Sequence, residues 1–398
     1  MTTKLRAASF QDGAVTTAKI AADAVTNAKI AASAVTENKL NIGQIGGRRN
    51  VIINGAMQIF ERDTSQGGIG ASAGYFTADR IRFKPNSTAG RLTSTQDSSG
   101  PSGFGNSLKL ACTTADTSIA AGEYFFISQK IEGFELQRFA KGTSDAKPFT
   151  VSFYVKGNAS ATYVCELFDE DNSRFCSKTF NVTTDWTRVE LTFPADTTGT
   201  FDDDNANSLA INFWLNGGGS FTSGTLNSSG FAANNGPDRA AGISSFFDST
   251  DRTFFLTGVQ LEVGQNPTEF EHEPFANTLR KCQRYYEKSY NQDTTPGTST
   301  HLGSRSTGGN QAANTTGEVG GYFPFIVTKR AAPTMTIYDQ SGNSGKTTIS
   351  LYGTGTTANQ TSSVSNMSET VFFVSRGSAG SPANATELYV QFEADSEL

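Results

Sequence analysis

The central part of the chain is a succession of short segments in which large apolar residues occupy alternate positions. In FTVSFYVKG, which begins at Phe149, Val151, Phe153 and Val155 are spaced by two. Successive side chains of a β-strand point to opposite faces of the sheet, so this spacing places the three side chains on one buried face. About ten such segments lie between residues 51 and 263, without helical patterns between them. They predict one antiparallel β-sandwich of the jelly-roll type.

The segment that follows these strands has a helical period instead. In PFANTLRKCQRYYEKSY, Phe275, Leu279, Cys282 and Tyr286 are spaced by four, three and four residues. This is the spacing of one face of an α-helix. We predict a helix over residues 275–290 in which these four side chains are buried, and which links the sandwich to a second, smaller β-domain.

Five further segments with strand character predict that C-terminal β-domain. They lie at residues 318–330, 334–339, 347–353, 369–377 and 387–395. The composition agrees, because 30 Phe, 40 Gly and only 11 Pro among 398 residues are typical of β-structure with long polar loops. We therefore expect a mainly β chain in four parts: an N-terminal segment over 1–46, the sandwich over 47–273, the linking helix over 274–290 and the C-terminal domain over 291–398.

Residues 13–40 contain a ten-residue repeat in which large apolar residues fall at every fifth position. A step of five turns about 140° around an α-helix and changes the face of a β-strand, so neither structure gives one apolar stripe. A chain that makes one turn per repeat does give one, but it can bury the stripe only against copies of itself around a symmetry axis. A flexible tail rich in Ala and Thr is the alternative. The predicted seam of this stalk consists of Val15, Ile20, Val25, Ile30, Val35, Leu40 and Ile45.

Charge is unevenly distributed along the chain. The net charge is −6, and because residues 1–50 have seven basic and three acidic side chains, the rest of the chain carries −10. An acidic body disfavours nucleic acid as a partner. Residues 1–12 contain Lys4, Arg6 and Phe10, which suit a peptide that anchors the chain to a partner protein, although a disordered leader would have a similar composition. The sequence has neither an apolar leader nor a run of about 18 apolar residues, so we expect no export signal and no membrane insertion.

The residue types that bind metals and form disulfides are few. Four cysteines without a CxxC pair and two histidines disfavour a zinc site, and we expect reduced thiols packed as small apolar groups. The acidic segments DEDNS at 169–173 and FDDDNANS at 201–208 resemble fragments of calcium loops. Both lack the central Gly and the late Glu of an EF-hand loop, so solvated turns are the favoured interpretation, with calcium binding left open. We predict no metal and no cofactor.

No catalytic constellation is recognisable in the sequence. His272 and His301 have no nucleophile motif such as GxSxG near them. Glycosidase chemistry needs two carboxylates across a cleft, and spacing cannot select such a pair among 38 acidic residues. The Gly-rich stretches do not follow the strand–GxxxxGK–helix pattern of phosphate binding. We therefore predict a protein that is not an enzyme and has no catalytic residues.

The remaining hypothesis is recognition at the protein surface. Flat aromatic rings surrounded by polar groups bind sugars, although most aromatic residues of a β-sandwich belong to its core. The candidates at loops or strand ends are Tyr75, Phe76, Trp214, Tyr290, Tyr322, Tyr338 and Tyr352. The long polar loops over 217–242 and 291–317 can vary without touching a core, so we place recognition there. The receptor contacts expected in and beside the distal loop are Tyr290, His301, Arg305 and Tyr322.

Three parts of the chain carry a further signal: NVIINGAMQIFER with YFTADRIRF, GVQLEVGQNPTEFEHEPFANTLRKCQRYYEKSY, and ELYVQFEADSEL. In this order they resemble the opening, the closing strand with its following helix, and the C-terminal ending of one family, the carbohydrate-binding-module-like jelly rolls in phage tail fibres of marine phages and cyanophages. Repeats such as AVTTAKIAADAVTNAKIA are common just upstream. These stretches together bracket residues 14–398. The resemblance implies a homotrimeric fibre in the virion tail that attaches to a host surface glycan; it supplies no binding residues.

The leading functional hypothesis is therefore a receptor-binding tail fibre whose stalk seam brings three chains together. Its N-terminus would join phage tail or adaptor proteins. One alternative is a structural virion decoration protein without receptor binding. A second is a tail spike that depolymerises host polysaccharide, although such enzymes usually carry a long parallel β-helix, for which this chain has no room.

Overall fold

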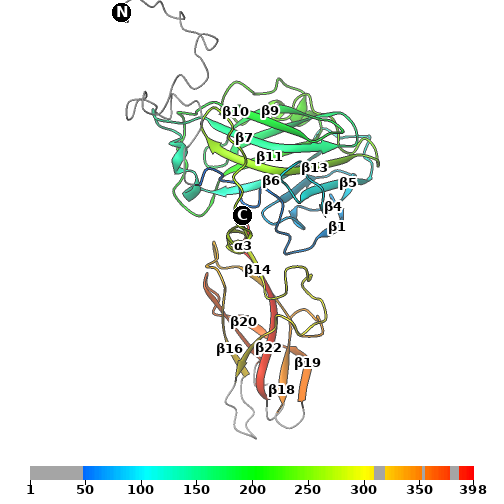
Figure 1. Cartoon of the computed structure of the whole chain (residues 1–398), viewed down its shortest axis with the longest axis vertical. Helices are drawn as coiled ribbons and strands as arrows, with labels where there is room; N and C mark the ends of the chain where they lie inside the picture. Colours follow the sequence, from blue (N-terminus) through cyan, green and yellow to red (C-terminus); the bar gives the residue numbers. More distant parts are fainter. Residues whose placement is uncertain (1–47, 309–318, 352–354, 377–384) are drawn as a thin grey trace, which may run out of the picture.

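The computed structural model of the chain describes residues 48–308, 319–351, 355–376 and 385–398. The predicted stalk seam, the anchor residues and Tyr352 lie outside these ranges, so they stay predictions. Two β-domains lie one beyond the other, with α3 (Phe275–Gln283) between them (Figure 1). No helix within the described ranges is long and apolar enough to cross a membrane.

The larger domain is a sandwich of two antiparallel sheets (Figure 1). The six-stranded sheet consists, in spatial order, of β1 (Ser65–Ile69), β4 (Arg91–Asp97), β5 (Ser107–Thr114), β13 (Thr253–Val263), β7 (Phe149–Gly157) and β10 (Thr187–Phe193). The seven-stranded sheet consists of β12 (Ala232–Ala233), β9 (Arg174–Val182), β8 (Ala161–Asp169), β11 (Asn207–Gly217), β6 (Tyr124–Glu132), β3 (Arg82–Asn86) and β2 (Gly74–Tyr75). The predicted sandwich is confirmed.

The core of the sandwich is built from the alternating apolar positions. Val151, Phe153 and Val155 of β7 are fully buried, as their spacing predicts. The ring of Phe153 meets Phe180 of β9 and Phe213 of β11 edge to face, with 5.0 Å between the ring centroids in both pairs. Because β9 and β11 belong to the opposite sheet, these rings hold the two layers together, and burying each side chain of this size contributes about 1.5–3 kcal/mol.

Helical structure in the described part of the sandwich is limited to short turns. They are η4 (Gly133–Glu135), η5 (Gln137–Phe139), α2 (Gly219–Thr222) and η6 (Gly236–Asp238). The four cysteines of the chain are buried and unpaired, which confirms the predicted reduced thiols.

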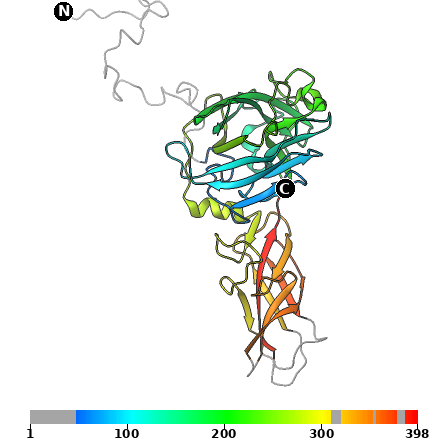
Figure 2. The ribbon, with the colours of Figure 1, turned by 90° about the vertical axis from the view of Figure 1, so that its right-hand side faces the viewer.

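The smaller domain is organised by one long strand, β22 (Ala385–Asp395), which runs along the domain toward the sandwich (Figure 2). Strand β22 pairs with β14 (Tyr286–Lys288), β15 (Arg305–Gly308), β17 (Thr334–Tyr338) and β18 (Lys346–Leu351), and β18 pairs with β19 (Gly355–Thr361). A separate sheet consists of β16 (Val319–Pro324), β21 (Val371–Arg376) and β20 (Ser363–Ser365). The two sheets share a core in which the rings of Phe372 and Phe392 lie 4.9 Å apart.

The linking helix is shorter than the sequence predicts. Helix α3 ends at Gln283, and Tyr286 begins β14 because the backbone of this segment pairs with the end of β22. This long-range pairing replaces the helical period after about two and a half turns. The predicted buried stripe is correspondingly wrong at Phe275, which is 47% exposed, whereas Leu279 is half-buried and Cys282 and Tyr286 are buried.

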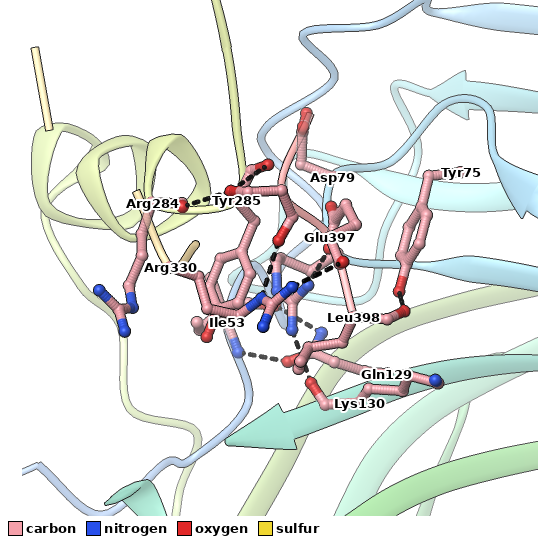
Figure 3. Close-up of polar contacts among 12 residues, drawn as sticks. Ile53, Tyr75, Asp79, Gln129, Lys130, Arg284, Tyr285, Arg330, Glu397 and Leu398 are labelled. Carbon is pink, nitrogen blue, oxygen red and sulfur yellow. Dashed lines mark hydrogen bonds and ion pairs between the residues drawn. The ribbon is translucent and has the colours of Figure 1, made fainter. Parts of the chain in front are cut away.

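The residues after β22 enter the junction between the two domains (Figure 3). The Glu397 carboxylate forms ion pairs with Arg80 and, at 3.4 Å, with Arg62. All three side chains are almost completely buried, and the Tyr75 hydroxyl donates a hydrogen bond of 2.9 Å to the Leu398 carbonyl oxygen. Charges removed from water in this way are stable only when each has a partner.

The two arginines that pair with Glu397 also stack on two consecutive tyrosines, one arginine on each ring. The Arg80 guanidinium carbon lies 3.4 Å from the ring centroid of Tyr285, and that of Arg62 lies 3.8 Å from the ring centroid of Tyr286. A desolvated cation–π contact contributes about 2 kcal/mol. Arg62 also pairs with Asp79 at 3.1 Å. The junction therefore alternates cations, carboxylates and aromatic rings from both domains.

Strand β6 makes a second polar connection to the segment after α3. The Glu132 carboxylate accepts two hydrogen bonds from Arg284, at 2.9 and 2.6 Å, and one from the Tyr285 hydroxyl. From the smaller domain, Arg330 donates to the Ser396 carbonyl oxygen at 2.8 Å and to that of Asn205, which belongs to the sandwich, at 3.2 Å. Several independent hydrogen bonds thus join the two domains.

Replacing Glu397 by alanine is expected to destabilise the junction. The change leaves Arg80 buried without a carboxylate partner, which costs about 3–5 kcal/mol. We expect a lower midpoint of thermal unfolding and faster limited proteolysis between the domains. Glu369 lies exposed in the same domain, so Glu369→Ala is the matched control. A Glu397→Ala variant that unfolds like the wild type would contradict the assigned role.

A buried carboxylate makes the stability of the junction depend on pH. Glu61 is 3% exposed, and one of its carboxylate oxygens has no hydrogen-bond partner in the described structure. Burial, together with the nearby Asp79 carboxylate, raises the pKa of Glu61 from 4.5 to about 8. Burial also raises the pKa of Asp79 itself. At intermediate pH the folded protein therefore keeps a proton that the unfolded chain has released.

The free energy of unfolding is expected to fall as the pH rises from about 5 to about 8, because the unfolded state binds fewer protons than the folded state in this range. The contribution of protonated Glu61 is complete below its unfolded pKa and is lost as the pH rises through its folded pKa. Glu61→Gln keeps this position neutral and should weaken the pH dependence, measured by denaturant unfolding at a series of pH values. The control Glu369→Gln should retain the wild-type dependence. Wild-type stability that rises over this range would refute the assignment.

Candidate functional site

A cleft of about 380 Å³ lies over the seven-stranded sheet of the sandwich, which is within the range of pockets that hold small ligands. Along β6, Tyr124, Phe126, Ser128 and Lys130 face the cleft at every second position, whereas the intervening Phe125 is buried in the core. The residues that line the cleft are Arg82, Lys84, Tyr124, Phe126, Ser128, Lys130, Phe168, Glu170, Ala210, Asn212, Trp214, Phe221 and Arg239.

Four aromatic rings make up one apolar part of the cleft. Tyr124 and Phe126 are nearly parallel, with 14° between the ring planes and 5.4 Å between the centroids. Phe221 on α2 meets Tyr124 edge to face at 5.0 Å. Trp214 is fully buried against these rings, 4.8 Å from Phe126. Tyr124, Phe126 and Phe221 are partly exposed and present ring surface to the cleft, while Trp214 supports them.

The carboxylate of Glu166 on β8 organises the polar groups beside these rings. Glu166 is fully buried and accepts hydrogen bonds from Trp214 Nε1 at 3.0 Å and Asn212 Nδ2 at 2.8 Å. Arg239 donates two more, each 2.7 Å long, in a bidentate arrangement. Charge-assisted bidentate pairs are the strong ones, so these four side chains form one rigid unit.

Arg239 is also held by aromatic rings. Its guanidinium carbon lies 4.5 Å from the ring centroid of Phe168 and 5.0 Å from that of Trp214. Burial lowers the pKa of Arg239, but the adjacent Glu166 carboxylate outweighs burial, so the pKa is raised overall. Arg239 therefore stays charged and closely held, and its charge is balanced by Glu166.

Two polar groups of residues that line the cleft have no hydrogen-bond partner among the described residues. Asn212 on β11 is 3% exposed, and its Oδ1 atom accepts no hydrogen bond from any described residue. Ser128 lies directly opposite it on β6, and its hydroxyl has no hydrogen-bond partner in the described ranges. An unsatisfied buried acceptor costs about 1–3 kcal/mol, which a hydroxyl group of a ligand would recover.

Basic side chains gather at the other side of the cleft. Arg82 and Lys84 on β3 and Lys130 on β6 are all half-buried. Burial, together with the neighbouring Arg82 guanidinium, lowers the pKa of Lys130. Glu170, the acidic residue of the lining, is exposed.

The receptor contacts predicted from the sequence lie away from this cleft, in the C-terminal domain. Tyr290 is only 5% exposed, with its ring against Tyr338 and its hydroxyl accepting a backbone hydrogen bond of 3.2 Å. Its burial contradicts the prediction of a receptor contact. His301 is exposed, Arg305 lies half-buried in β15, and Tyr322 is 60% exposed on β16. These three stay predictions.

The predicted recognition loop over 217–242 does reach the cleft, to which it contributes Phe221 and Arg239. The expectation that it varies without touching a core is wrong. Phe231 is buried in the main core, and Ala240 is fully buried against Trp214. The sequence of this loop is therefore constrained by packing.

Trp214 is among the aromatic candidates predicted from the sequence, whereas Tyr124, Phe126 and Phe221 are not. A signal for two of them is present in the strand EYFFISQKI. Its core face carries Phe125 and Ile127, and its other face also carries two aromatic residues where a solvated strand would have polar ones. Aromatic residues on both faces of a strand indicate that the outer face is covered or binds a ligand.

A second hollow, of about 420 Å³, lies at the junction of the domains, where Tyr75, Phe76 and Tyr338 line it. These are three of the aromatic candidates from the sequence. The Tyr338 hydroxyl donates a hydrogen bond of 2.6 Å to Glu393, and the Tyr75 hydroxyl donates to the end of the chain. Their polar groups thus contribute to the junction itself.

The acidic segments that resemble calcium-loop fragments make internal contacts. The Asp169 carboxylate lies 2.5 Å from Lys141 Nζ, and both side chains are fully buried. Asp171 accepts a hydrogen bond of 3.0 Å from the backbone N–H of Asp202, which links the two segments. Within the described part of the chain, no three or more His, Cys, Asp or Glu side chains are grouped so that they could hold a metal ion.

Neither a protein-family model nor a curated protein matches the sequence. Among solved structures, the chain is similar to one described as "CBM4 structure and function", with a TM-score of 0.27, 13% identity and coverage of 53% of this chain and 97% of that one. It is similar to the enzymatically active domain of tailspike protein 4 from bacteriophage CBA120, with a TM-score of 0.27, 12% identity and coverage of 54% and 21%. A family 11 carbohydrate-binding module from Clostridium thermocellum gives a TM-score of 0.25, 13% identity and coverage of 53% and 99%. At such low TM-scores these similarities do not determine the function of this chain.

Glu166→Gln is expected to destabilise the sandwich and to disorganise the cleft. The substitution leaves the Arg239 charge without its carboxylate and breaks a buried pair, at a cost of about 3–5 kcal/mol. Denaturant unfolding should give a lower free energy of unfolding, and the tryptophan fluorescence spectrum should change because the group that accepts the Trp214 hydrogen bond loses its charge. Glu170→Gln, at the exposed rim, is the control and should unfold like the wild type. Equal stability of the two variants would argue against the role of Glu166.

Proposed function

We propose that this chain is a receptor-binding fibre of a phage tail, and that the cleft of its sandwich binds a glycan of the host surface. The observation that carries the glycan-binding part is the combination of exposed ring surface with unsatisfied polar groups in one cleft. Tyr124, Phe126 and Phe221 lie on one side, and Asn212 Oδ1 and the Ser128 hydroxyl lie on the floor.

This combination suits the chemistry of a sugar. The C–H bonds of a pyranose ring form an apolar face that packs on an aromatic ring, while its hydroxyl groups lie around the edge and need hydrogen-bond partners. Phe126 pairs in register with Lys84 on β3 and with Trp214 on β11. A ring packed on Phe126 would therefore have Lys84 beside it on β3, and on β11 the polar Asn212 lies two positions from Trp214. These side chains are held on strands of a packed sheet, so little conformational entropy is lost when a ligand binds.

The assignment to a phage tail is supported by the sequence. The resemblance of three separate stretches to tail-fibre jelly rolls favours it, as does the five-residue apolar step that favours a homotrimeric stalk. Under this proposal the protein is located in the tail of the virion, the stalk aligns three clefts, and the peptide with Lys4, Arg6 and Phe10 joins a tail or adaptor protein. Neither nucleic acid nor a membrane is a proposed partner.

Binding rather than hydrolysis is proposed for the cleft because its carboxylates are not placed as a catalytic pair. Both oxygens of Glu166 accept hydrogen bonds from Asn212, Trp214 and Arg239, so this group is neither a free nucleophile nor a proton donor. Only Glu170 remains in the lining, and canonical glycoside hydrolysis uses two carboxyl groups.

Phe126→Ala is expected to weaken binding of the purified full chain to oligosaccharides by about tenfold or more, since removing a stacked ring loses on the order of 1–2 kcal/mol. Binding is measured by titration calorimetry against oligosaccharides selected on a glycan array, and adhesion by labelled protein on whole host cells. The exposed Phe134 lies outside the cleft, so Phe134→Ala is the matched control. Wild-type protein that binds neither glycans nor cells would favour the structural decoration protein, and release of reducing sugar from host polysaccharide would favour the depolymerising spike.

A further inference from the structure

We propose that the cleft selects an anionic saccharide, one whose sugar rings carry carboxylate or sulfate groups. This inference rests on the proposed glycan-binding function and specifies the class of ligand. It is carried by the arrangement of Arg82, Lys84 and Lys130, which lie on the same face of two paired strands next to the aromatic rings.

The three basic side chains are neighbours. Arg82 and Lys84 are two positions apart on β3, and Arg82 is opposite Ser128 in the register of β3 with β6. Lys130 is therefore diagonal to Arg82 on the same face, at a separation that long side chains bridge easily. Like charges in such positions repel each other.

Among the described residues, no carboxylate forms an ion pair with any of these three cations. Within the described ranges, none of the three side chains has an ion pair or a hydrogen bond to a protein acceptor. Glu166 is committed to Arg239, and Glu170 is exposed at the rim. A cluster of three basic side chains is unexpected from the composition, because the chain beyond residue 50 carries a net charge of −10. Half-burying three cations without a partner costs free energy, and a bound anion would recover it.

The position of these cations relative to the rings matches a charged sugar. Lys84 is directly opposite Phe126 in the sheet, so a pyranose ring that packs on Phe126 would extend a ring substituent toward Lys84 and Arg82. Arginine binds carboxylate and sulfate oxygens with two parallel N–H groups, and lysine acts as a point charge. Burial and the neighbouring cations Arg82 and Lys84 lower the pKa of Lys130, and together they outweigh the opposite effect of the Glu170 carboxylate. An anionic ligand would raise that pKa again.

The test uses the purified full chain and matched pairs of probes. One pair is an oligogalacturonate and its carboxyl-reduced, neutral form; the other is a sulfated galactan oligosaccharide and its desulfated form. We expect at least one anionic probe to bind with an affinity at least about tenfold higher than that of its neutral partner. This difference in affinity should shrink as the NaCl concentration is raised from about 50 to about 500 mM, because salt screens the charges. The pair that shows the larger difference identifies carboxylate or sulfate as the preferred group.

Substitutions separate charge recognition from ring packing. Lys84→Gln and Lys130→Gln should each weaken binding of the anionic probe by about tenfold, as expected for loss of one charge-assisted contact, and leave binding of the neutral probe unchanged. Phe126→Ala should weaken both. Lys147 is exposed on a loop outside the cleft, so Lys147→Gln has the same change of charge and should have no effect.

Two outcomes are distinct failures. If the wild type binds neutral and anionic probes equally, without dependence on salt, the charge inference is overturned and the glycan-binding function stands. If it binds no member of either pair and no glycan on an array, both are overturned. Unchanged affinity of Lys84→Gln and Lys130→Gln for the anionic probe would assign its binding to another part of the chain.

Discussion

The burial of the Glu397 carboxylate between two arginines is the interaction on which the arrangement of the two β-domains depends. Arg62 and Arg80 come from the start of the sandwich, and each stacks on one of the consecutive residues Tyr285 and Tyr286. Because unpaired charges cannot be buried cheaply, this cluster forms only when all three segments meet. These three segments coincide with the stretches on which the sequence resemblance to tail-fibre jelly rolls rests, so the resembling residues include those that join the domains.

A second buried carboxylate, that of Glu166, holds together the side chains at the cleft. Glu166 holds the indole of Trp214, the amide of Asn212 and the guanidinium of Arg239 in one hydrogen-bonded unit. Its pairing with Arg239 brings a long loop onto the sheet, and with that loop comes the ring of Phe221. A rigid cleft with some unsatisfied polar groups suits ligand binding. Its side chains are already ordered in the folded protein, so binding would cost little further conformational entropy.

Local sequence patterns predicted those parts of the structure that depend on local geometry. The spacing of Val151, Phe153 and Val155 predicted their burial, because a strand exposes its two faces alternately whatever its neighbours are. The helical spacing over 275–290 was only partly reliable. Tyr286 pairs with the distant Asp395, and backbone hydrogen bonds to β22 outweighed the local period.

By itself, the sequence determined that the chain is mainly β and that a helix separates two β-domains. Only the tertiary structure decided where the candidate site lies. Tyr124, Phe168 and Trp214 come from three separate strands, and the registers of β6, β8 and β11 bring these residues together. The site could not be predicted because the spacing within a segment specifies which face a side chain occupies, whereas the pairing of distant strands specifies which side chains share that face.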